Sequence, residues 1–175
     1  MLKEMGYEFE VMAADIDEKA IRHANPKELV LALANAKADA LVPKITEPAI
    51  LITADQVVAW NGQIREKPEN EEEAREFLQT YYQAPAEAIN GIAVTNTATG
   101  KRLVATDSTI IYFKAIPAET IDRFVKREDI YRRAGGFAIQ DPEIEPYIEK
   151  IEGTVDSIIG LPKALVEKLI QEVQE

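Results

Sequence analysis

The most informative stretch of this sequence is AILITADQVVAW, residues 49–60. Residues 49–54 form a short, continuously apolar run, which is typical of a β-strand covered on both faces. The run ends at Asp55, and a second apolar run, Val57 to Trp60, leads into Asn61-Gly62, a dipeptide typical of a tight hairpin turn. The stretch therefore predicts a buried strand that presents Asp55 at its end, followed by a hairpin.

Capping residues and prolines predict four helices around this strand. The motif NPKE (25–28) supplies a capping residue, a proline at the first helical position and an acid in the first turn. In the motif NEEE (70–73), an asparagine cap is followed three residues later by a glutamate. Pro117 and Pro162 can each open a further helix. We therefore expect helices over 26–41, 71–81, 117–126 and 162–173.

Alternating or continuous apolar residues predict further strands. The segments 88–95 and 102–114 are expected to form two long antiparallel strands joined through Thr99-Gly100. Shorter strands are expected at 7–12, 147–151 and 157–159. The order of these elements predicts an α/β fold in which a mixed sheet is surrounded by helices.

The net charge excludes several classes of partner. The chain has 175 residues, with 20 Lys and Arg against 31 Asp and Glu, so its formal net charge is −11. Such an acidic protein repels long nucleic acids and anionic membranes. With 46% hydrophobic residues, the composition is that of a folded globule.

The residue inventory also restricts the chemistry. There is no Cys and a single His, so thiolate sites, Ser-His-Asp triads and multi-His metal sites are disfavoured. Any catalysis is then expected to depend on carboxylates, lysines and a hard metal ion. The charged segment 1–9 lacks the apolar core of a signal peptide, and no stretch has the length of a membrane span, so we expect a cytoplasmic protein.

Two side chains stand out in otherwise apolar surroundings. Lys37 continues the apolar stripe of the helix 26–41, where it either extends its ammonium past apolar neighbours or lines a cleft. Asp55 either caps its own turn or presents a functional carboxylate at a strand end. Both alternatives remain open from the pattern alone.

Two clusters have weaker signals. Asp15, Asp17 and Glu18 could bind a hard cation such as Mg²⁺ through oxygens, although a solvated acidic loop is commoner. In RRAGGFAIQ (132–140), the two arginines and the glutamine could contact a phosphate or a base edge. The alternative is a surface turn whose glycines supply positive φ angles.

Taken in order, these segments resemble the Maf family of nucleoside triphosphate pyrophosphatases. The similarity covers nearly the whole chain, with the motifs in the family's order and at its spacings. REKP (65–68) and GLPKAL (160–165) are most similar to the plant-type branch. The matching stretches are FEVMAADIDE (9–18), LALANAKADAL (31–41), ILITADQVV (50–58), IREKPENEEEAREFL (64–78), INGIAV (89–94), IYFKAIPAETIDRFV (111–125), RAGGFAIQ (133–140) and IEGTVDSIIGLP (151–162).

The resemblance implies a single domain over residues 1–175, with an elongated twisted sheet and two lobes around a cleft, similar to inosine triphosphate pyrophosphatases. It implies hydrolysis of a nucleoside triphosphate to the monophosphate and pyrophosphate with Mg²⁺ or Mn²⁺. The implied substrates are dTTP, UTP or a modified nucleotide, in keeping with a role in cleansing nucleotide pools. A homodimer is compatible with the resemblance, because homodimers are common in the family.

The resemblance also assigns roles to individual residues. Asp55 falls on the aspartate proposed to activate water in the family. The implied substrate-binding residues are Lys37, Lys67, Gln140 and Gln56, and the implied metal ligands are Asp17 and Asp55.

Two departures from the family pattern define the competing hypotheses. The family normally begins with a strand and an SSSPRR-type loop for the phosphates, and this chain begins downstream of that loop, so we expect an N-terminally truncated form. Gln140-Asp141 replaces the usual QG, and Arg133 to Phe137 replaces KAGGY.

The alternative to an active pyrophosphatase is a catalytically impaired nucleotide-binding or interaction protein that lacks the phosphate loop. A third hypothesis is a metal-dependent phosphohydrolase that releases inorganic phosphate.

Overall fold

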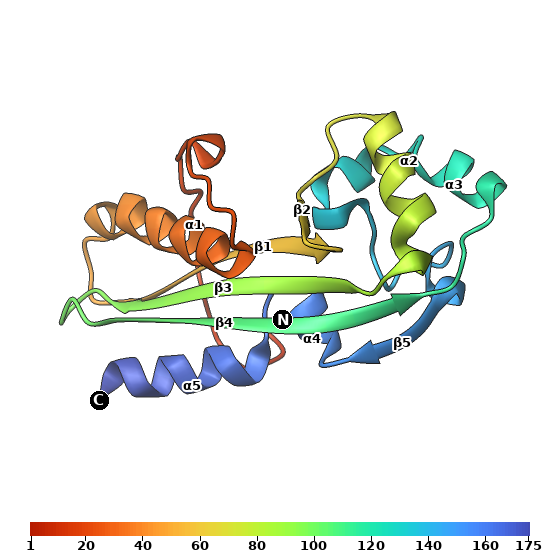
Figure 1. The fold of residues 1–175 in the computed structure, drawn as a ribbon. Coiled ribbons are helices and arrows are strands. Elements are labelled where there is room, and N and C mark those ends of the chain that lie inside the picture. The colour runs from red at the N-terminus through yellow and green to blue at the C-terminus, as the bar shows by residue number, and fades with distance from the viewer. The chain divides into compact units, whose positions relative to one another are not determined.

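The computed structural model describes all residues from Met1 to Glu175. It has an α/β fold with one five-stranded sheet in the order β2-β1-β3-β4-β5 (Figure 1). The strands are β1 (Ile50–Trp60), β2 (Gln63–Arg65), β3 (Ala86–Asn96), β4 (Arg102–Phe113) and β5 (Ile148–Glu152). The α-helices are α1 (Pro26–Leu41), α2 (Glu71–Thr80), α3 (Ala118–Phe124), α4 (Val155–Ile158) and α5 (Lys163–Gln174). Short 3-10 helices are η1 (Glu18–Ala20), η2 (Val42–Lys44), η3 (Tyr81–Gln83), η4 (Glu128–Arg132), η5 (Ala134–Gly136) and η6 (Glu145–Tyr147).

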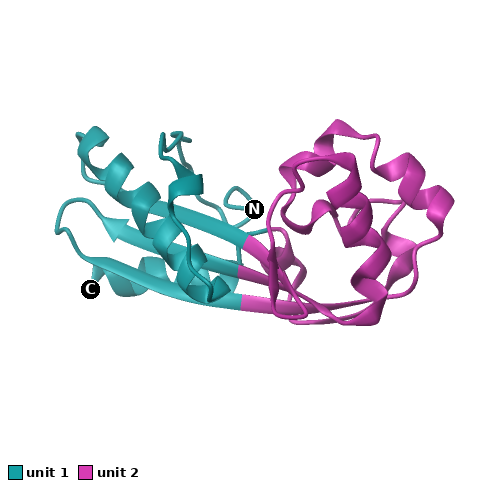
Figure 2. Ribbon diagram, turned by 45° about the horizontal axis from the view of Figure 1, so that its top comes forward, with its two compact units in different colours: residues 1–56, 90–107, 160–175 teal, residues 57–89, 108–159 magenta.

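The chain divides into two compact units (Figure 2). Unit 1 contains residues 1–56, 90–107 and 160–175, and unit 2 contains residues 57–89 and 108–159. Each unit has its own apolar core. We describe the two units separately.

Unit 1 is built on the first half of β1, the second half of β3 and the first half of β4. In Figure 1, α1 covers one side of these strands and α5 covers the other. The helix α1 lies against β3 at Gly91, where a Cβ atom would come within 2.4 Å of the Val30 carbonyl group. Only glycine leaves room for this approach. The core on the α5 side consists of Ile92, Val94, Val166, Leu169, Ile170 and Val173.

Unit 2 has a core centred on three aromatic rings. Tyr81 stacks on Phe113 with ring centroids 5.1 Å apart, and Phe137 packs edge-on against both rings. At the edge of this unit, β2 pairs antiparallel with β1, and β5 pairs antiparallel with β4. The hairpin predicted at Asn61-Gly62 is thereby confirmed.

The four predicted helices are confirmed, and the two predicted asparagine caps form. Asn25 Oδ1 accepts a hydrogen bond from the Lys27 amide at 2.9 Å, and Asn70 Oδ1 accepts one from the Glu73 amide at 2.9 Å. The strands predicted over 88–95, 102–114 and 147–151 are confirmed as β3, β4 and β5 within one or two residues. The predicted α/β class, with helices around a sheet, is therefore confirmed, although the pairings β1–β2 and β4–β5 are antiparallel and the sheet is not the mixed one that was predicted.

Three local predictions are wrong. The two apolar runs around Asp55 form one continuous strand, β1, so Asp55 lies within a strand rather than at its end. Residues 157–159 do not form a strand, because Thr154 caps the short helix α4 through its side-chain oxygen, 3.4 Å from the Ser157 amide. A capped turn satisfies these backbone groups locally, without a partner strand.

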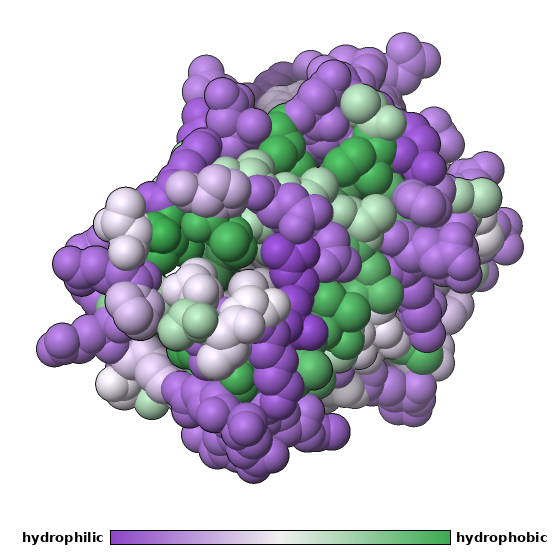
Figure 3. Space-filling view, turned by 90° about the vertical axis from the view of Figure 1, so that its left-hand side faces the viewer, coloured by the Kyte–Doolittle hydropathy of each residue, from purple (hydrophilic) through white to green (hydrophobic).

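The segment 7–12 is also not a strand, despite its alternating pattern. A strand requires a hydrogen-bonded neighbour, and this segment pairs with none of the five strands. Its apolar side chains remain at the surface, where Val11 is 87% exposed and Phe9 and Met12 are half-exposed. Figure 3 shows the face at the left of Figure 1, where green apolar surface lies among purple polar side chains.

No helix in the structure is both long enough and apolar enough to span a membrane.

Candidate functional site

A largely enclosed ion pair joins α1 to β1 in unit 1. The Nζ atom of Lys37 lies 2.6 Å from Oδ1 of Asp55 and 3.4 Å from the carbonyl oxygen of Ala54. The two side chains are only 18% and 12% exposed, respectively. Lys37 therefore turns its ammonium toward β1, and Asp55 does not merely cap a turn. Both sequence-predicted residues belong to one polar centre in otherwise apolar surroundings.

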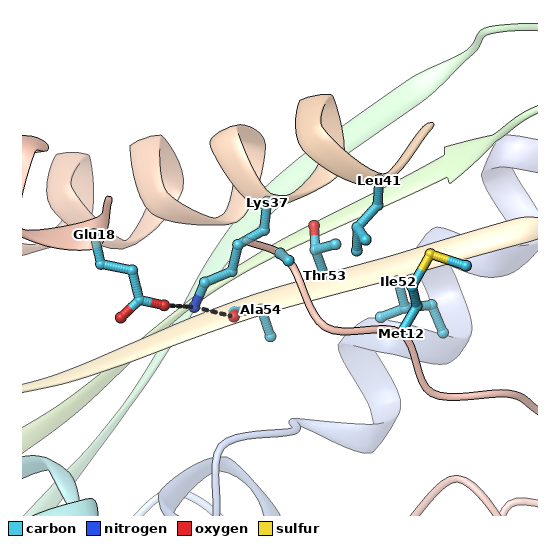
Figure 4. A pocket seen from close by; sticks show the side chains of 8 residues that line it. Met12, Glu18, Lys37, Leu41, Ile52, Thr53 and Ala54 are labelled. Atoms are coloured by element: carbon cyan, nitrogen blue, oxygen red, sulfur yellow. Dashed lines mark hydrogen bonds and ion pairs between the residues drawn. The ribbon is translucent and has the colours of Figure 1, made fainter. Parts of the chain in front are cut away.

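Glu18, one of the three acids named above as possible cation ligands, is a third member of this centre, although the resemblance assigned the role of metal ligand to Asp17. Its Oε1 atom lies 2.9 Å from Lys37 Nζ, as Figure 4 shows. Asp17, the predicted metal ligand, is exposed, and its side chain makes no capping hydrogen bond to η1. The available signal was the acidic run itself, but the run does not specify which of its carboxylates faces the lysine.

Lys37 is held in its charged form by its two partners. Burial lowers the pKa of the Lys37 ammonium, but hydrogen bonds and charge attraction from Asp55 and Glu18 outweigh burial and raise its pKa above the usual value. The ammonium of Lys37 therefore lies between the side-chain oxygens of Asp55 and Glu18. Such a fixed ammonium can offset negative charge on a phosphorylated ligand.

A pocket of about 330 Å³ adjoins the Lys37 side chain in unit 1. Figure 4 shows Lys37 reaching across the pocket to Glu18 and the backbone of β1, with the apolar side chains of Leu41, Ile52 and Met12 farther along. The pocket thus has a charged part and an apolar part. Its lining residues are Met12, Ala14, Glu18, Lys37, Leu41, Ile52, Thr53 and Ala54.

Gln56 follows Asp55 in β1 and is held by a buried asparagine. Its Nε2 atom donates a hydrogen bond to Oδ1 of Asn90 at 3.1 Å, and Asn90 is fully buried. The orientation of the Gln56 side chain is therefore fixed by its neighbours in unit 1.

Lys67 and Gln140 belong to unit 2. Lys67 is exposed between Arg65 and Pro68, which are both buried. The Gly135 amide donates a hydrogen bond to the Glu66 carbonyl at 2.9 Å, which attaches the Lys67 loop to η5. Gln140 is exposed at a turn that follows η5 along the chain. Both predicted residues thus project from anchored loops of the same unit.

The glycines of η5 are not in a surface turn. Gly135 and Gly136 are buried, with φ angles of 70° and 69°. A Cβ atom at Gly135 would lie 2.7 Å from the Tyr81 hydroxyl, so the position requires glycine for both conformation and space. Arg133 does not face an open site, because its Nη2 atom lies 2.6 Å from Oδ2 of Asp129.

Two carboxylates of unit 1 belong to the centre around Lys37. The carboxylates of Asp55 and Glu18 both lie within hydrogen-bond distance of the same lysine, and Asp17 directly precedes Glu18. Oxygen ligands of this kind suit Mg²⁺ or Mn²⁺, which usually combine one or two carboxylates with phosphate oxygens of a substrate. The structure has no group of three or more His, Cys, Asp or Glu side chains arranged around a metal position.

The fold is of the α/β class, and its polar centre is a lysine paired with two carboxylates. The chain belongs to the Maf-like family, whose model, described as Maf-like protein, matches residues 1–173.

Curated relatives cover most of the chain. A 7-methyl-GTP pyrophosphatase of Dictyostelium discoideum is 43% identical over 100% of this chain and 91% of that protein. A dTTP/UTP pyrophosphatase of Pelotomaculum thermopropionicum is 33% identical over 98% of this chain and 89% of that protein. A nucleoside triphosphate pyrophosphatase of a Synechococcus species is 33% identical over 99% of this chain and 87% of that protein.

Proposed function

We propose that this protein is a nucleoside triphosphate pyrophosphatase, which hydrolyses its substrate to the monophosphate and pyrophosphate. The observation that carries the proposal is the largely enclosed Lys37–Asp55 pair, with Nζ 2.6 Å from Oδ1. The names of the relatives support the reaction, because each denotes a nucleotide pyrophosphatase. The buried pair supplies the two chemical groups that such a reaction needs, a carboxylate and a fixed positive charge.

Asp55 is proposed as the general base. Its carboxylate accepts the proton of the attacking water while the water oxygen forms the new bond to phosphorus. The bond between the α-phosphorus and the bridging oxygen breaks, and its electron pair leaves with pyrophosphate. Lys37 contributes one fixed positive charge to the centre, which is proposed to stabilise the negative charge that develops on the phosphate oxygens. Lys67, Gln140 and Gln56 are proposed to contact the substrate.

Mg²⁺ or Mn²⁺ is proposed as the cofactor. Asp17 and Asp55 are the proposed ligands, and Glu18 is a neighbouring carboxylate of the same centre. When bound with the nucleotide, the ion supplies positive charge close to the phosphate oxygens. The proposal predicts that chelation of divalent cations abolishes pyrophosphate release and that added Mg²⁺ or Mn²⁺ restores it.

The proposed substrate is dTTP, UTP or a modified nucleotide. The relative with 43% identity is named for 7-methyl-GTP, which favours a modified nucleotide, whereas relatives at 33% identity include one named for dTTP and UTP. A panel that contains these three compounds and the common nucleoside triphosphates separates the alternatives through their kcat/KM values.

The decisive experiment measures monophosphate and pyrophosphate from this panel for the natural chain and the Asp55→Asn variant. We expect the amide to reduce turnover by about 1,000-fold, since it cannot accept the proton. Asp39→Asn is the matched control, because Asp39 is an exposed acid of α1 that pairs with Arg102 outside the centre. Unchanged turnover in Asp55→Asn would exclude Asp55 as the base.

Two other outcomes point to different functions. Nucleotide binding in calorimetry without any product identifies a binding protein rather than an enzyme. Release of inorganic phosphate instead of pyrophosphate identifies a different phosphohydrolase.

A further inference from the structure

Gln140 is an exposed residue between two buried ones. Ile139 and Asp141 are each only 7% exposed, and the Asp141 amide closes the turn by donating to the Ala138 carbonyl at 3.1 Å. The direction of the Gln140 side chain therefore depends on how firmly its two neighbours are anchored. Ile139 is anchored by the apolar core of unit 2, and Asp141 needs a polar anchor.

Arg127 supplies this anchor. Its Nη2 atom lies 2.7 Å from Oδ2 of Asp141, whose side chain is 6% exposed. The other carboxylate oxygen of Asp141, Oδ1, accepts a hydrogen bond from the Glu143 amide at 3.0 Å. Both oxygens of this buried carboxylate are thus bonded, one to a charged group and one to the backbone. A buried carboxylate with these partners is fixed in place.

Arg127 is itself held from three sides. Its Nε and Nη2 atoms donate to the two carboxylate oxygens of Asp129, each at 3.0 Å. Its guanidinium lies 4.7 Å from the centroid of the Phe124 ring, at the end of α3. Its Nη1 atom also lies 3.6 Å from a carboxylate oxygen of Glu143. The bidentate pair and the ring orient the guanidinium, so that one donor remains directed at Asp141.

We propose that Arg127 and Asp141 are positioning residues that set the direction of Gln140 for nucleotide binding. This proposal rests on the proposed function only in taking Gln140 as a substrate contact. Arg127 connects the end of α3 to the turn over 138–141, and it acts on the ligand through Gln140. The anchoring therefore affects substrate affinity, whereas the centre around Lys37 and Asp55 is unaffected.

The test is a double-mutant cycle between Asp141→Asn and Gln140→Ala, measured through KM, kcat and the dissociation constant for the preferred nucleotide. We expect Asp141→Asn to raise KM and the dissociation constant about 10-fold and to change kcat less than about threefold. When Asp141→Asn is added to the Gln140→Ala variant, KM and the dissociation constant should each rise less than about twofold, because the side chain that Asp141 positions is absent. Arg127→Lys should give an intermediate effect, since it keeps the charge but loses the bidentate geometry.

Controls separate positioning from general loosening of unit 2. Asp122→Asn removes a different ion pair of this unit, with Arg75, and should leave KM unchanged. Thermal midpoints identify variants that are simply unstable. In an unstable variant, hydrogen exchange at the Gln140 and Asp141 amides measures how often the turn opens. We expect exchange to become faster in this turn and to stay unchanged elsewhere in unit 2.

The outcomes distinguish this proposal from the proposed function. If Asp141→Asn raises KM by the same factor in the natural chain and in the Gln140→Ala variant, the positioning role is overturned and the enzymatic function is left intact. Binding without turnover by the natural chain overturns the enzymatic function, and the cycle then uses the dissociation constant alone. A natural chain that neither binds nor hydrolyses any nucleotide of the panel overturns both.

Discussion

Lys37 and Asp55, 18 residues apart in the sequence, meet at 2.6 Å between a helix and the middle of a strand. The pair is nearly enclosed, and Glu18 reaches the same ammonium from η1. One lysine therefore links α1, β1 and the segment that precedes α1. Because the ammonium is fixed before any ligand arrives, little reorganisation is needed when negative charge develops beside it.

Replacing Lys37 with Met should remove function more than stability. The variant keeps most of the side-chain volume but leaves Asp55 largely buried without its cation, which we expect to cost about 2 kcal/mol of unfolding free energy. Pyrophosphate release should fall at least about 100-fold. Initial rates and urea unfolding at neutral pH measure the two effects. A variant that unfolds normally and keeps more than half of its kcat/KM would refute the role of the ammonium.

Acid should weaken the anchor of the Gln140 turn within a defined pH range. Burial raises the pKa of Asp141, but hydrogen bonds from Arg127 and the Glu143 amide outweigh burial and hold it below its usual value of 3.8. Since the pKa is lower in the folded chain, the carboxylate stabilises the fold above pH 3.8 and loses this effect as pH falls through the lower value.

We therefore expect the difference in unfolding free energy between the natural chain and Asp141→Asn to stay constant above about pH 5 and to shrink below about pH 4. Urea unfolding at a series of pH values measures it. Asp122→Asn provides the comparison for general acid effects in the same unit. A difference that grows with acidity would mean that Asp141 is not held in its charged form.

Much of the fold could be predicted because its helices carry local signals. Asn25 and Asn70 cap their helices as their positions in the sequence indicate. The segment 7–12 shows the limit of such reasoning, since alternation predicts a strand but cannot supply the neighbour that a strand needs. Asp55 was expected at a strand end because the apolar run over residues 49–54 stops there, and a carboxylate is rarely enclosed within a strand unless it is paired. The partner that makes this burial acceptable is Lys37, from a distant part of the sequence.

The candidate site was predictable to a similar extent. The apolar stripe around Lys37 and the family resemblance together indicated Lys37 and Asp55, which the structure brings together. Glu18 could not be chosen over Asp17, because the turn of η1 decides which side chain faces α1 and the acidic run does not encode that turn. The anchor of Gln140 was missed for the same reason, since Arg127 and Asp141 are distant in sequence and meet only in the folded unit.

Arg65 should be replaceable by an apolar residue more readily than by lysine. The residue is 2% exposed, and its guanidinium lies 3.9 Å from the Trp60 ring centroid and 4.8 Å from that of Tyr81. It donates to the Phe77 carbonyl and the Thr80 hydroxyl, but its Nε atom has no hydrogen-bond partner. Lysine would bury a charge that cannot stack in the same way, whereas methionine removes the charge and keeps the volume.

We expect Arg65→Lys to cost about 3 kcal/mol of unfolding free energy and Arg65→Met roughly half as much. Urea unfolding followed through the fluorescence of Trp60, the only tryptophan of the chain, measures both. A methionine variant less stable than the lysine variant would show that the charge itself stabilises this part of unit 2.

Gly135 should tolerate no side chain. An alanine there would have its Cβ 2.7 Å from the Tyr81 hydroxyl and 2.8 Å from Val58, at a φ angle of +70° that L-residues rarely adopt. The hydrogen bond from Tyr81 to the Gly135 carbonyl, now 2.9 Å long, would have to lengthen or break. Gly100→Ala is the matched control, because Gly100 has a φ angle of +76° but open space around its Cβ position.

Gly100→Ala should lose about 1 kcal/mol of unfolding free energy, which is the cost of the positive φ angle alone. Gly135→Ala should lose about 3 kcal/mol, because overpacking against Tyr81 and Val58 adds to the cost of the φ angle. The Glu66 carbonyl accepts from the Gly135 amide, so the Gly135 variant should also disturb the Lys67 loop and raise the KM for the nucleotide. Denaturant unfolding and steady-state kinetics of the two variants provide the comparison. Equal losses of stability in both would show that conformation, and not contact with Tyr81, selects glycine at this position.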